Sequence, residues 1–595
     1  MRVRIEAGAL ADHAKTKGLV FPGLLILVAV LIASTIVLTW VPPVSRDALT
    51  HHLTVPKLYL QRGGLYEIPT VAYSYYPMNL DLLYMVPLYF GNDMAPKLIH
   101  FLFALLTAWL IFGYLKRRTD RNWAMVGVLF FLSLPIIVKL SITVYVDLGL
   151  LYFSTASIMG LFKWNADRER LKFLILSAVC CGLALGTKYN GLIVLLILTI
   201  LVPMIFIRNT GDQPNPKNPS GKGTCSMRPI KALGLGVLFF WVALLTFSPW
   251  MIRNYAWKAN PVYPLFDNVF NPSTAKSANV NNANHELEPA AKPQQTLKRK
   301  PTRWSPLNLR KVLYGESWWE IGLLPVRIFF QGEDDNPKYF DGKLNPFLFC
   351  LPFFAFMGLR SNTPNLITEK IVLLLFSILF LLVAFSQASI RIRYVAPVIA
   401  PLVMLAVLGF HDLAAVLASR LKSRHRWIAA VCIALLAGGL FAYNGVYIRR
   451  QFKLVKPFSY LSGAVSRDEY ITGYRPEYAI YQYANRNLPA DAKILGLFLG
   501  NRRYYSEREV IFGVELFKEI VYQAHSEDML LYQLNEKGFT HIVIRYDLFN
   551  RWHNRLFNDH KAEMLKRFFV GQLRHLLSKN GYGIFELQLK VSKPG

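Results

Sequence analysis

Long runs without a charged residue constrain this chain more than any other feature. The first, residues 19–41, is uncharged and mostly apolar, and is long enough to cross a bilayer at about 1.5 Å per residue. Similar runs recur as far as residue 446, and only 17% of the 595 residues are charged while 53% are hydrophobic. A soluble chain of this length carries more charge. The sequence therefore predicts a polytopic α-helical membrane protein.

Hydropathy and flanking charges predict about eleven membrane-spanning helices. They lie near residues 19–41, 93–115, 122–140, 145–162, 172–187, 190–207, 232–252, 346–359, 371–388, 394–412 and 428–446. The eighth is short and contains Pro352. The first is too long for a signal peptide and lacks a small-residue cleavage site, so it is expected to remain as an anchor.

Basic residues indicate the orientation of these helices. With the amino terminus in the cytoplasm, the inside segments hold 23 Lys and Arg, against 7 in the short outside loops. This asymmetry is typical of cytoplasmic loops. Basic loops that contact anionic lipid headgroups also account for the net charge of +30, so this charge does not indicate a nucleic-acid partner. The loops 42–92 and 253–345 and the carboxyl-terminal tail are then expected outside.

The chain divides into a transmembrane part, 1–448, and a carboxyl-terminal α/β domain, 449–595. The tail suggests strands from Lys493 and from His541, helices over 527–536 and 560–578, and a strand over 582–589. Within the outer loops, 47–60 suits an interfacial helix, and 271–303 has the polar composition of a disordered insert. No cysteine lies in the large outer domain, so no disulfide framework is expected there.

Two carboxylates at membrane boundaries are the first candidate site residues. Asp47 follows the first apolar run directly, and Asp147 opens another. An acid at such a place is costly and usually functional. Asp47 could instead cap a helix, and Asp147 could simply pair with Lys139 or Lys188.

Five local motifs on the expected outer side resemble the GT-C superfamily of membrane glycosyltransferases, in particular its bacterial branch related to protein O-mannosyltransferases and lipid A aminoarabinose transferases. The motifs are Asp47-Ala-Leu-Thr-His-His-Leu, Tyr145-Val-Asp147, Gly186-Thr-Lys188-Tyr, Ser248-Pro-Trp250-Met-Ile-Arg253-Asn254 with Asn260-Pro-Val-Tyr-Pro264, and Arg391-Ile-Arg393-Tyr394-Val-Ala-Pro397. The insert at 271–303 departs from the pattern, and no motif identifies the sugar or the acceptor.

The resemblance implies a glycosyltransferase of the bacterial inner membrane. It would take a sugar from a polyprenyl-phosphate donor and pass it to a hydroxyl of a glycan, lipid or protein on the periplasmic side. Asp47 is the candidate base or acceptor-orienting group, with Asp147 as a supporting carboxylate. Fixed cations would neutralise the leaving phosphate. The candidates are Lys188, Arg253, Arg391 and Arg393, although each could instead contact ordinary lipid phosphates.

Further residues are candidates for contacts with acceptor, sugar or metal. The contact candidates are His51, His52, Tyr75, Tyr76 and Tyr394, while interfacial histidines and membrane-interface tyrosines are the plain alternatives. The one cofactor that the residues suggest is a divalent cation. Its oxygen ligands would come from Asp47, Asp147, Glu333 and Asp334, the last two in an acidic loop that could also be a solvated turn.

Other functions remain open at this stage. A secondary transporter would need inverted repeats and interrupted helices with charge near the bilayer midplane, and no matching pair of interrupted helices is evident. A lipid-linked polysaccharide polymerase or ligase would share the donor chemistry. A non-catalytic scaffold would leave Asp47 and Asp147 unexplained.

Overall fold

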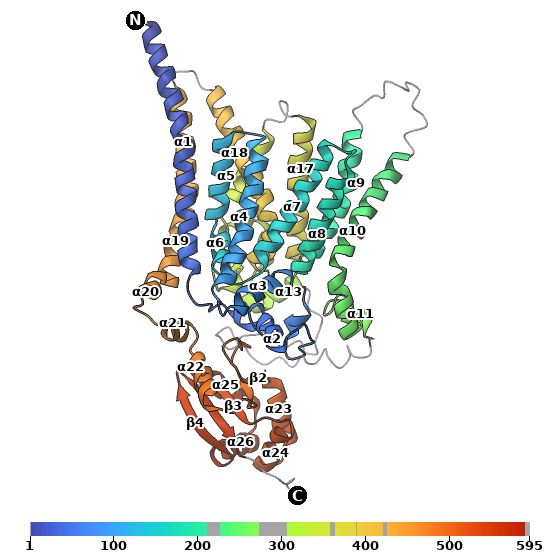
Figure 1. The fold of residues 1–595 in the computed structure, drawn as a ribbon, viewed down its shortest axis with the longest axis vertical. Coiled ribbons are helices and arrows are strands. Elements are labelled where there is room, and N and C mark those ends of the chain that lie inside the picture. The colour runs from blue at the N-terminus through green and yellow to red at the C-terminus, as the bar shows by residue number, and fades with distance from the viewer. Residues whose placement is uncertain are drawn as a thin grey trace.

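The computed structural model describes residues 2–210, 227–272, 306–357, 363–387, 390–420 and 425–588. A bundle of roughly parallel and antiparallel helices carries an α/β domain at one end, and the amino terminus lies at the other end (Figure 1). The predicted fold class, a polytopic helical membrane protein with a carboxyl-terminal α/β domain, is confirmed. Most of the predicted insert, 273–303, lies outside the described residues.

The predicted spans coincide, in order, with helices or broken helices of the bundle. These are α1 (Arg2–Thr39), α4 (Ala95–Lys116), α5 (Arg121–Ser133) with α6 (Pro135–Ser141), α7 (Asp147–Ala166), α8 (Leu171–Thr187), α9 (Gly191–Thr210), α10 (Met227–Lys258), α16 (Phe347–Cys350) with η5 (Leu351–Phe356), α17 (Pro364–Phe385), η7 (Ile392–Val398) with α18 (Ile399–Arg420), and α19 (Arg426–Val455).

Length separates these helices into two kinds. In the described ranges, seven are long and apolar enough to cross a membrane, and the α5–α6 pair makes an eighth if counted as one span bent by 62°. Among the described residues, the expected spans at 172–187 and 346–359 contain shorter apolar helices, the 17-residue α8 and the ten-residue α16–η5 segment, against the roughly 20 residues that a crossing needs. The α16–η5 segment is the shorter of the two. It packs closely on α18, since a Cβ on Gly409 would lie 2.1 Å from the Leu351 carbonyl oxygen.

The bend between α5 and α6 follows from one residue. Pro135 is the first residue of α6, and Leu134 before it has an extended ψ of 134°. A proline disfavours the helical conformation of the preceding residue and cannot donate to the previous turn. The helix therefore breaks there, and α6 leads directly into the short segment before Asp147.

Short helices cover the end of the bundle that faces the α/β domain (Figure 1). From the first loop come η1 (Ala48–His52), α2 (Thr54–Arg62), η2 (Ala72–Tyr75) and α3 (Asn79–Tyr89), and from the later loop α11 (Asp267–Phe270), α13 (Pro306–Tyr314), α14 (Trp318–Gly322), α15 (Leu324–Phe330) and η4 (Pro337–Tyr339). The helix predicted over 47–60 is present as η1 and α2, joined at Leu53, which keeps helical dihedrals of φ −102° and ψ −32°. Pro56 is tolerated because its missing N–H falls in the first turn of α2, where no intrahelical partner is needed.

The carboxyl-terminal part begins with α20 (Pro457–Leu461), α21 (Arg467–Tyr474) and α22 (Tyr478–Asn487). A five-stranded sheet follows, in the order β2-β1-β3-β5-β4. Its strands and helices are β1 (Lys493–Leu497), β2 (Glu509–Phe512), α23 (Val514–Gln523), α24 (Glu527–Glu536), β3 (His541–Arg545), α25 (Tyr546–Leu556), α26 (Asp559–Gly571), β4 (Leu573–Lys579) and β5 (Tyr582–Leu587). β1, β2 and β3 are parallel, whereas β4 and β5 form an antiparallel hairpin.

The tail prediction holds for most of these elements and fails at one boundary. The helix over 527–536 and the strands from Lys493 and His541 are present. The helix predicted over 560–578 ends at Gly571, and 573–579 form β4 instead. The Asn580-Gly581 turn pairs these residues with β5, so hairpin pairing prevails over the local helical pattern.

Hydrogen bonds fasten the α/β domain to the first loop. The backbone N–H groups of Arg503 and Tyr504 both donate to the Leu49 carbonyl oxygen, at 3.2 Å each. Lys57 Nζ in turn donates to the Tyr504 carbonyl oxygen at 2.9 Å. Asp93 and Arg467 form an ion pair of 2.6 Å at the start of α4. The segment that follows β1 is therefore held against the loop that carries Asp47.

Candidate active site

Asp47 lies just before η1 and is paired with a cation. Its side chain makes no capping hydrogen bond, so the cap alternative does not describe it. Arg393 Nη1 donates to Asp47 Oδ2 at 2.6 Å. Burial opposes ionisation of this carboxyl, but Arg393 and the two adjacent histidines outweigh burial and hold the pKa of Asp47 below its ordinary value. Asp47 is therefore a carboxylate at neutral pH.

Asp147 is the first residue of α7 and pairs with the residue that follows α8. Lys188 Nζ lies 2.6 Å from Asp147 Oδ1, and the Asp147 side chain is only 1% exposed. Of the two partners expected from the sequence, Lys188 is the one in contact, whereas Lys139 pairs elsewhere. Asp147 Oδ2 is buried, and no described residue hydrogen-bonds to it. A buried carboxylate of this kind depends on its one cation.

Tyr394 joins the two ion pairs into one cluster. Its ring centroid lies 5.0 Å from Lys188 Nζ and 5.3 Å from the Arg393 guanidinium. The ring of Tyr145 lies 4.8 Å from that same guanidinium. Both cations therefore contact aromatic faces, an arrangement favoured by the ring quadrupole. The structure brings four of the predicted motifs together here.

The predicted histidines lie beside this cluster in different settings. His52 Nδ1 is 2.7 Å from Asp81 Oδ1, and both side chains are buried. His51 stacks on Tyr73, with ring centroids 4.4 Å apart. Burial first, and then His52, lower the pKa of His51 well below its ordinary value, so its ring is neutral at pH 7.

Asp81 is a site residue that sequence reasoning missed. Its signal was an acid within the otherwise apolar α3, the same kind of costly carboxylate that pointed to Asp147.

Arg253, near the end of α10, differs from the other cations. Its Nη2 donates to the carbonyl oxygens of Tyr75 and Tyr76, at 2.6 and 3.1 Å. Its guanidinium lies against Trp250 and Trp257, at 4.5 and 4.9 Å from their rings. Among the described residues no carboxylate lies within ion-pair distance of it, and its Nη1 is buried without a partner. Arg253 is thus a largely desolvated cation without a protein anion.

Tyr75 and Tyr76 connect Arg253 to the histidines. The Tyr75 hydroxyl donates to Glu67 at 2.6 Å, so this side chain is already engaged. The ring of Tyr76 lies 5.3 Å from that of Tyr73, which stacks on His51. An aromatic path therefore runs from the Arg253 region to the Asp47 cluster.

A lysine lies among the carboxylates of the acidic loop. Lys139 Nζ is 3.0 Å from Asp341 Oδ1 and 3.2 Å from Asp334 Oδ1. Arg391, a predicted phosphate ligand, lies 3.5 Å from Asp341 rather than in the Asp47 cluster. In the described part of the chain, no group of three or more His, Cys, Asp or Glu residues is arranged to hold a metal ion.

The expected metal ligands do not fit a divalent cation. Asp47 and Asp147 each face a basic side chain, and Lys139 holds the position among the loop carboxylates that a cation would need. Asp334 and Asp341 of this loop are ion-paired with Lys139, while Glu333 and Asp335 remain exposed in a turn.

A family model matches part of this chain. Residues 69–258 match the family model described as dolichyl-phosphate-mannose-protein mannosyltransferase. No curated protein matches the sequence significantly.

Solved structures of similar fold extend the likeness to the whole chain. The crystal structure of ArnT from Cupriavidus metallidurans in the apo state has a TM-score of 0.52 at 13% identity, covering 95% of this chain and 98% of its own. Its undecaprenyl phosphate-bound form has 0.53 at 14%, covering 96% and 99%. The Archaeoglobus fulgidus oligosaccharyltransferase tethered with an acceptor peptide has 0.52 at 10%, covering 94% and 74%. The chain therefore has the fold of the GT-C superfamily of membrane glycosyltransferases, as the motifs predicted.

Proposed function

We propose that this protein transfers a sugar from a polyprenyl-phosphate donor to an acceptor hydroxyl at the periplasmic face of the bacterial inner membrane. The observation that carries the proposal is the cluster in which Asp47–Arg393 and Asp147–Lys188 meet around Tyr394. The α/β domain contacts the loop that carries Asp47, through hydrogen bonds from Arg503 and Tyr504 to the Leu49 carbonyl oxygen. The ArnT structure of similar fold is bound to undecaprenyl phosphate, which supports a lipid-linked donor.

Arg253 is the proposed contact for the donor phosphate. A desolvated guanidinium without a carboxylate partner is stabilised by a ligand anion. Its buried Nη1 has no partner among the described residues, whereas Arg393 and Lys188 are already paired. The donor phosphate would supply the negative charge that no carboxylate of the described residues provides to Arg253.

In the proposed reaction, the acceptor oxygen attacks the anomeric carbon as the bond from that carbon to the phosphate oxygen breaks. The bonding electrons leave with the polyprenyl phosphate, whose second negative charge is met by Arg253 and Lys188. The hydroxyl proton passes to Asp47. Because Arg393 lowers the pKa of Asp47, this proton transfer comes late, after the hydroxyl has become acidic through bond formation.

Asp47 also has the geometry to orient the acceptor. Arg393 engages Oδ2, and none of the described side chains donates to Oδ1. The Asp47 side chain remains 20% exposed. Oδ1 is therefore the oxygen offered to the acceptor hydroxyl.

The test is sugar transfer by purified protein in detergent. Mass spectrometry of lipids, glycans and glycoproteins from a deletion strain and its parent would first identify donor and product. Wild-type protein should then release polyprenyl phosphate only when donor and acceptor are both present. Release without an acceptor product would contradict the proposal, and chain elongation of the product would identify a polymerase. Movement of a solute across vesicles without transfer would identify a transporter.

A further inference from the structure

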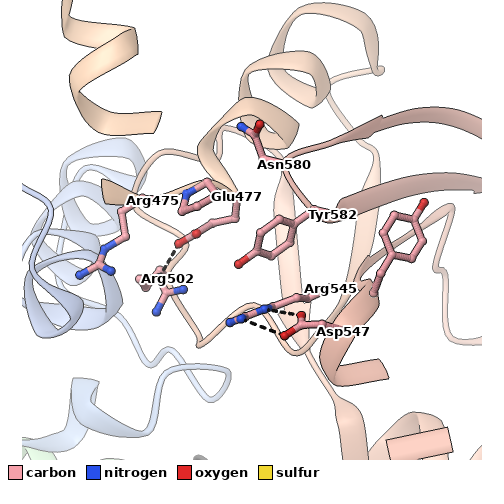
Figure 2. Close-up of a pocket in the computed structure, with 10 residues that line it drawn as sticks. Arg475, Glu477, Arg502, Arg545, Asp547, Asn580 and Tyr582 are labelled. Carbon is pink, nitrogen blue, oxygen red and sulfur yellow. Dashed lines mark hydrogen bonds and ion pairs between the residues drawn. The ribbon is translucent and has the colours of Figure 1, made fainter. Parts of the chain in front are cut away.

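A second polar site lies in the α/β domain, and none of the Asp47-cluster residues lines it. A cavity of 590 Å³ opens at the carboxyl ends of β1 and β3, within the size range of ligand pockets. Its walls come from Arg502 after β1, Arg545 and Asp547 at β3, Tyr582 at the start of β5, and Glu477 before α22 (Figure 2).

The topology of the sheet makes this position a natural ligand site. From β1 the chain turns to β2 on one side, whereas β3 lies on the other side of β1 and continues toward β4 at the far edge. The connections after β1 and β3 therefore diverge and leave a crevice at the carboxyl ends of these parallel strands. Open α/β sheets bind ligands in such crevices.

The hairpin between β4 and β5 closes the cavity. Asn580 and Gly581 have φ values of 54° and 82°, which fits a two-residue turn that requires positive φ at both positions. This turn begins β5 at Tyr582, whose ring lies 5.9 Å from the Arg545 guanidinium. The tyrosine ring is thereby fixed as one wall.

Two ion pairs line the cavity, with Tyr582 between them (Figure 2). Arg502 Nε donates to Glu477 Oε1 at 2.5 Å. Arg545 donates from Nε and Nη2 to the two oxygens of Asp547, at 2.7 and 3.1 Å. A carboxylate with a fixed orientation can accept a hydrogen bond from a hydroxyl group, and a fixed guanidinium can donate to a carboxylate or phosphate group.

After this pairing, several polar atoms of the cavity have no hydrogen-bond partner among the described residues. Arg475, Arg502 and Arg545 all line the cavity, but the Arg475 guanidinium is turned to the Val44 carbonyl oxygen, so two guanidiniums and two carboxylates face the cavity. No partner among the described residues engages the terminal nitrogens of Arg502 or Nη1 of Arg545. Glu477 is 2% exposed, and its Oε2 is buried without a hydrogen-bond partner. The cavity is therefore suited to a ligand that carries both an anionic group and a hydroxyl donor.

The cavity also connects to the proposed reaction site. Arg475 Nε donates to the Val44 carbonyl oxygen at 2.5 Å, and Arg475 points toward the amino-terminal elements in Figure 2. Val44 lies three residues before Asp47, a stretch of at most about 11 Å. A ligand in the cavity thus lies beside the loop that carries Asp47.

We propose that this cavity binds an anionic saccharide, and that it holds the part of a glycan acceptor that does not react. The anion would meet Arg502 and Arg545, a sugar hydroxyl would donate to Glu477 Oε2, and a sugar face would lie on Tyr582. The acceptor role rests on the proposed function, whereas saccharide binding itself does not.

Binding is tested without donor or turnover. Saturation-transfer NMR on the full-length protein in detergent is titrated with glucose 6-phosphate, glucuronate, glucose and inorganic phosphate. We expect both anionic sugars to bind at least about 10-fold more tightly than glucose or phosphate, because each of these lacks one of the two required groups. Equal affinity for glucose, or for phosphate alone, would overturn the proposal.

A matched pair of substitutions locates the site. Arg545→Gln should weaken binding of the anionic sugars about 10- to 100-fold, the loss of one charge-assisted contact. The control is Arg551→Gln, because Arg551 also pairs with Asp547, at 3.0 Å, but does not line the cavity. Unchanged binding in Arg545→Gln, or equal weakening in the control, would refute the assignment. Glu477→Gln, which keeps the side-chain volume, provides a second variant with the same expected loss.

Turnover then separates docking from chemistry. With an identified glycan acceptor, Arg545→Gln should raise the acceptor KM about 10-fold or more while kcat changes less than about 2-fold. A fall in kcat at constant KM would contradict a docking role. If the wild-type protein transfers no sugar at all, the proposed function fails while the NMR result still decides the saccharide site.

Discussion

Arg393 Nη1 lies 2.6 Å from Asp47 Oδ2, although 346 residues separate the two in the sequence. The pair joins the first loop to the start of η7, and it fixes the charge of a carboxylate that the proposed chemistry uses. Asp47 is consequently positioned more firmly, and is a weaker base, than an isolated aspartate at a membrane surface.

Asp47→Asn should lower transfer about 10²- to 10⁴-fold while the amount of folded protein is maintained, because the amide keeps the shape but cannot take the proton. Initial rates with purified protein measure this. Asp120→Asn is the control, since Asp120 caps α5 and asparagine caps equally well. Near-wild-type turnover in Asp47→Asn would remove the residue from the chemistry.

The acid limb of the pH–rate profile should not come from Asp47. Its folded-state pKa lies below the ordinary 3.8, so Asp47 stays ionised as the pH falls from 8 to about 5. Its contribution to stability is present above an unfolded pKa of about 3.9 and is lost only as the pH falls through the lower folded value. An acid limb near pH 6.5 that survives in Asp47→Asn would instead indicate a histidine.

Lys188→Ala should reduce transfer at least about 10- to 100-fold and also destabilise the protein. It leaves the buried Asp147 carboxylate unpaired, at a cost of about 3–5 kcal/mol. The double variant Asp147→Asn/Lys188→Gln should recover much of the thermal stability in detergent but not the transfer. If Lys188→Ala unfolds at the wild-type temperature, the pair is not structural.

Arg253→Gln should raise the donor KM about 10- to 100-fold through loss of one charged contact to phosphate. Titration of donor at saturating acceptor gives the measurement. Arg62→Gln serves as the control, because Arg62 is an exposed arginine of the first loop. An unchanged donor KM in Arg253→Gln would assign its guanidinium to holding the Tyr75 and Tyr76 carbonyls alone.

A periplasmic reporter fused after residue 470 should be active, because the asymmetry of basic residues places the tail outside. A fusion after residue 118, in the α4–α5 connection, should report the cytoplasm. A cytoplasmic signal from both fusions would put the α/β domain on the wrong side for a periplasmic acceptor.

The fold was largely predictable because its signals are local. Apolar runs locate the helices, and Pro135 explains the one bend that hydropathy overlooked. Local pattern failed where pairing decides the structure: residues 573–579 read as helix, but the Asn580-Gly581 turn brings them onto β5. The change from η1 to α2 at Leu53 falls just before Pro56, whose missing N–H was visible in the sequence.

The site was predictable in membership and not in pairing. Asp47 and Asp147 were predicted from the cost of an acid at a membrane boundary together with the resemblance, and each lies beside a basic side chain in the structure. Which cation meets which acid depends on contacts between distant helices, so Arg393 and Arg391 looked alike although only Arg393 contacts Asp47. The proposed role of Arg253 rests on the finding that no carboxylate of the described residues lies within ion-pair distance of it. A sequence motif does not show this.

The docking of the α/β domain depends mainly on main-chain oxygens of the first loop. Arg475, Tyr505 and the N–H groups of Arg503 and Tyr504 donate to the carbonyls of Val44, Pro43 and Leu49. Every residue type carries such a carbonyl, so replacing a side chain on the loop removes none of these acceptors. A substitution beside Asp47 therefore leaves these backbone anchors of the domain in place, whereas the contacts of Lys57 and Asp93 do depend on side chains.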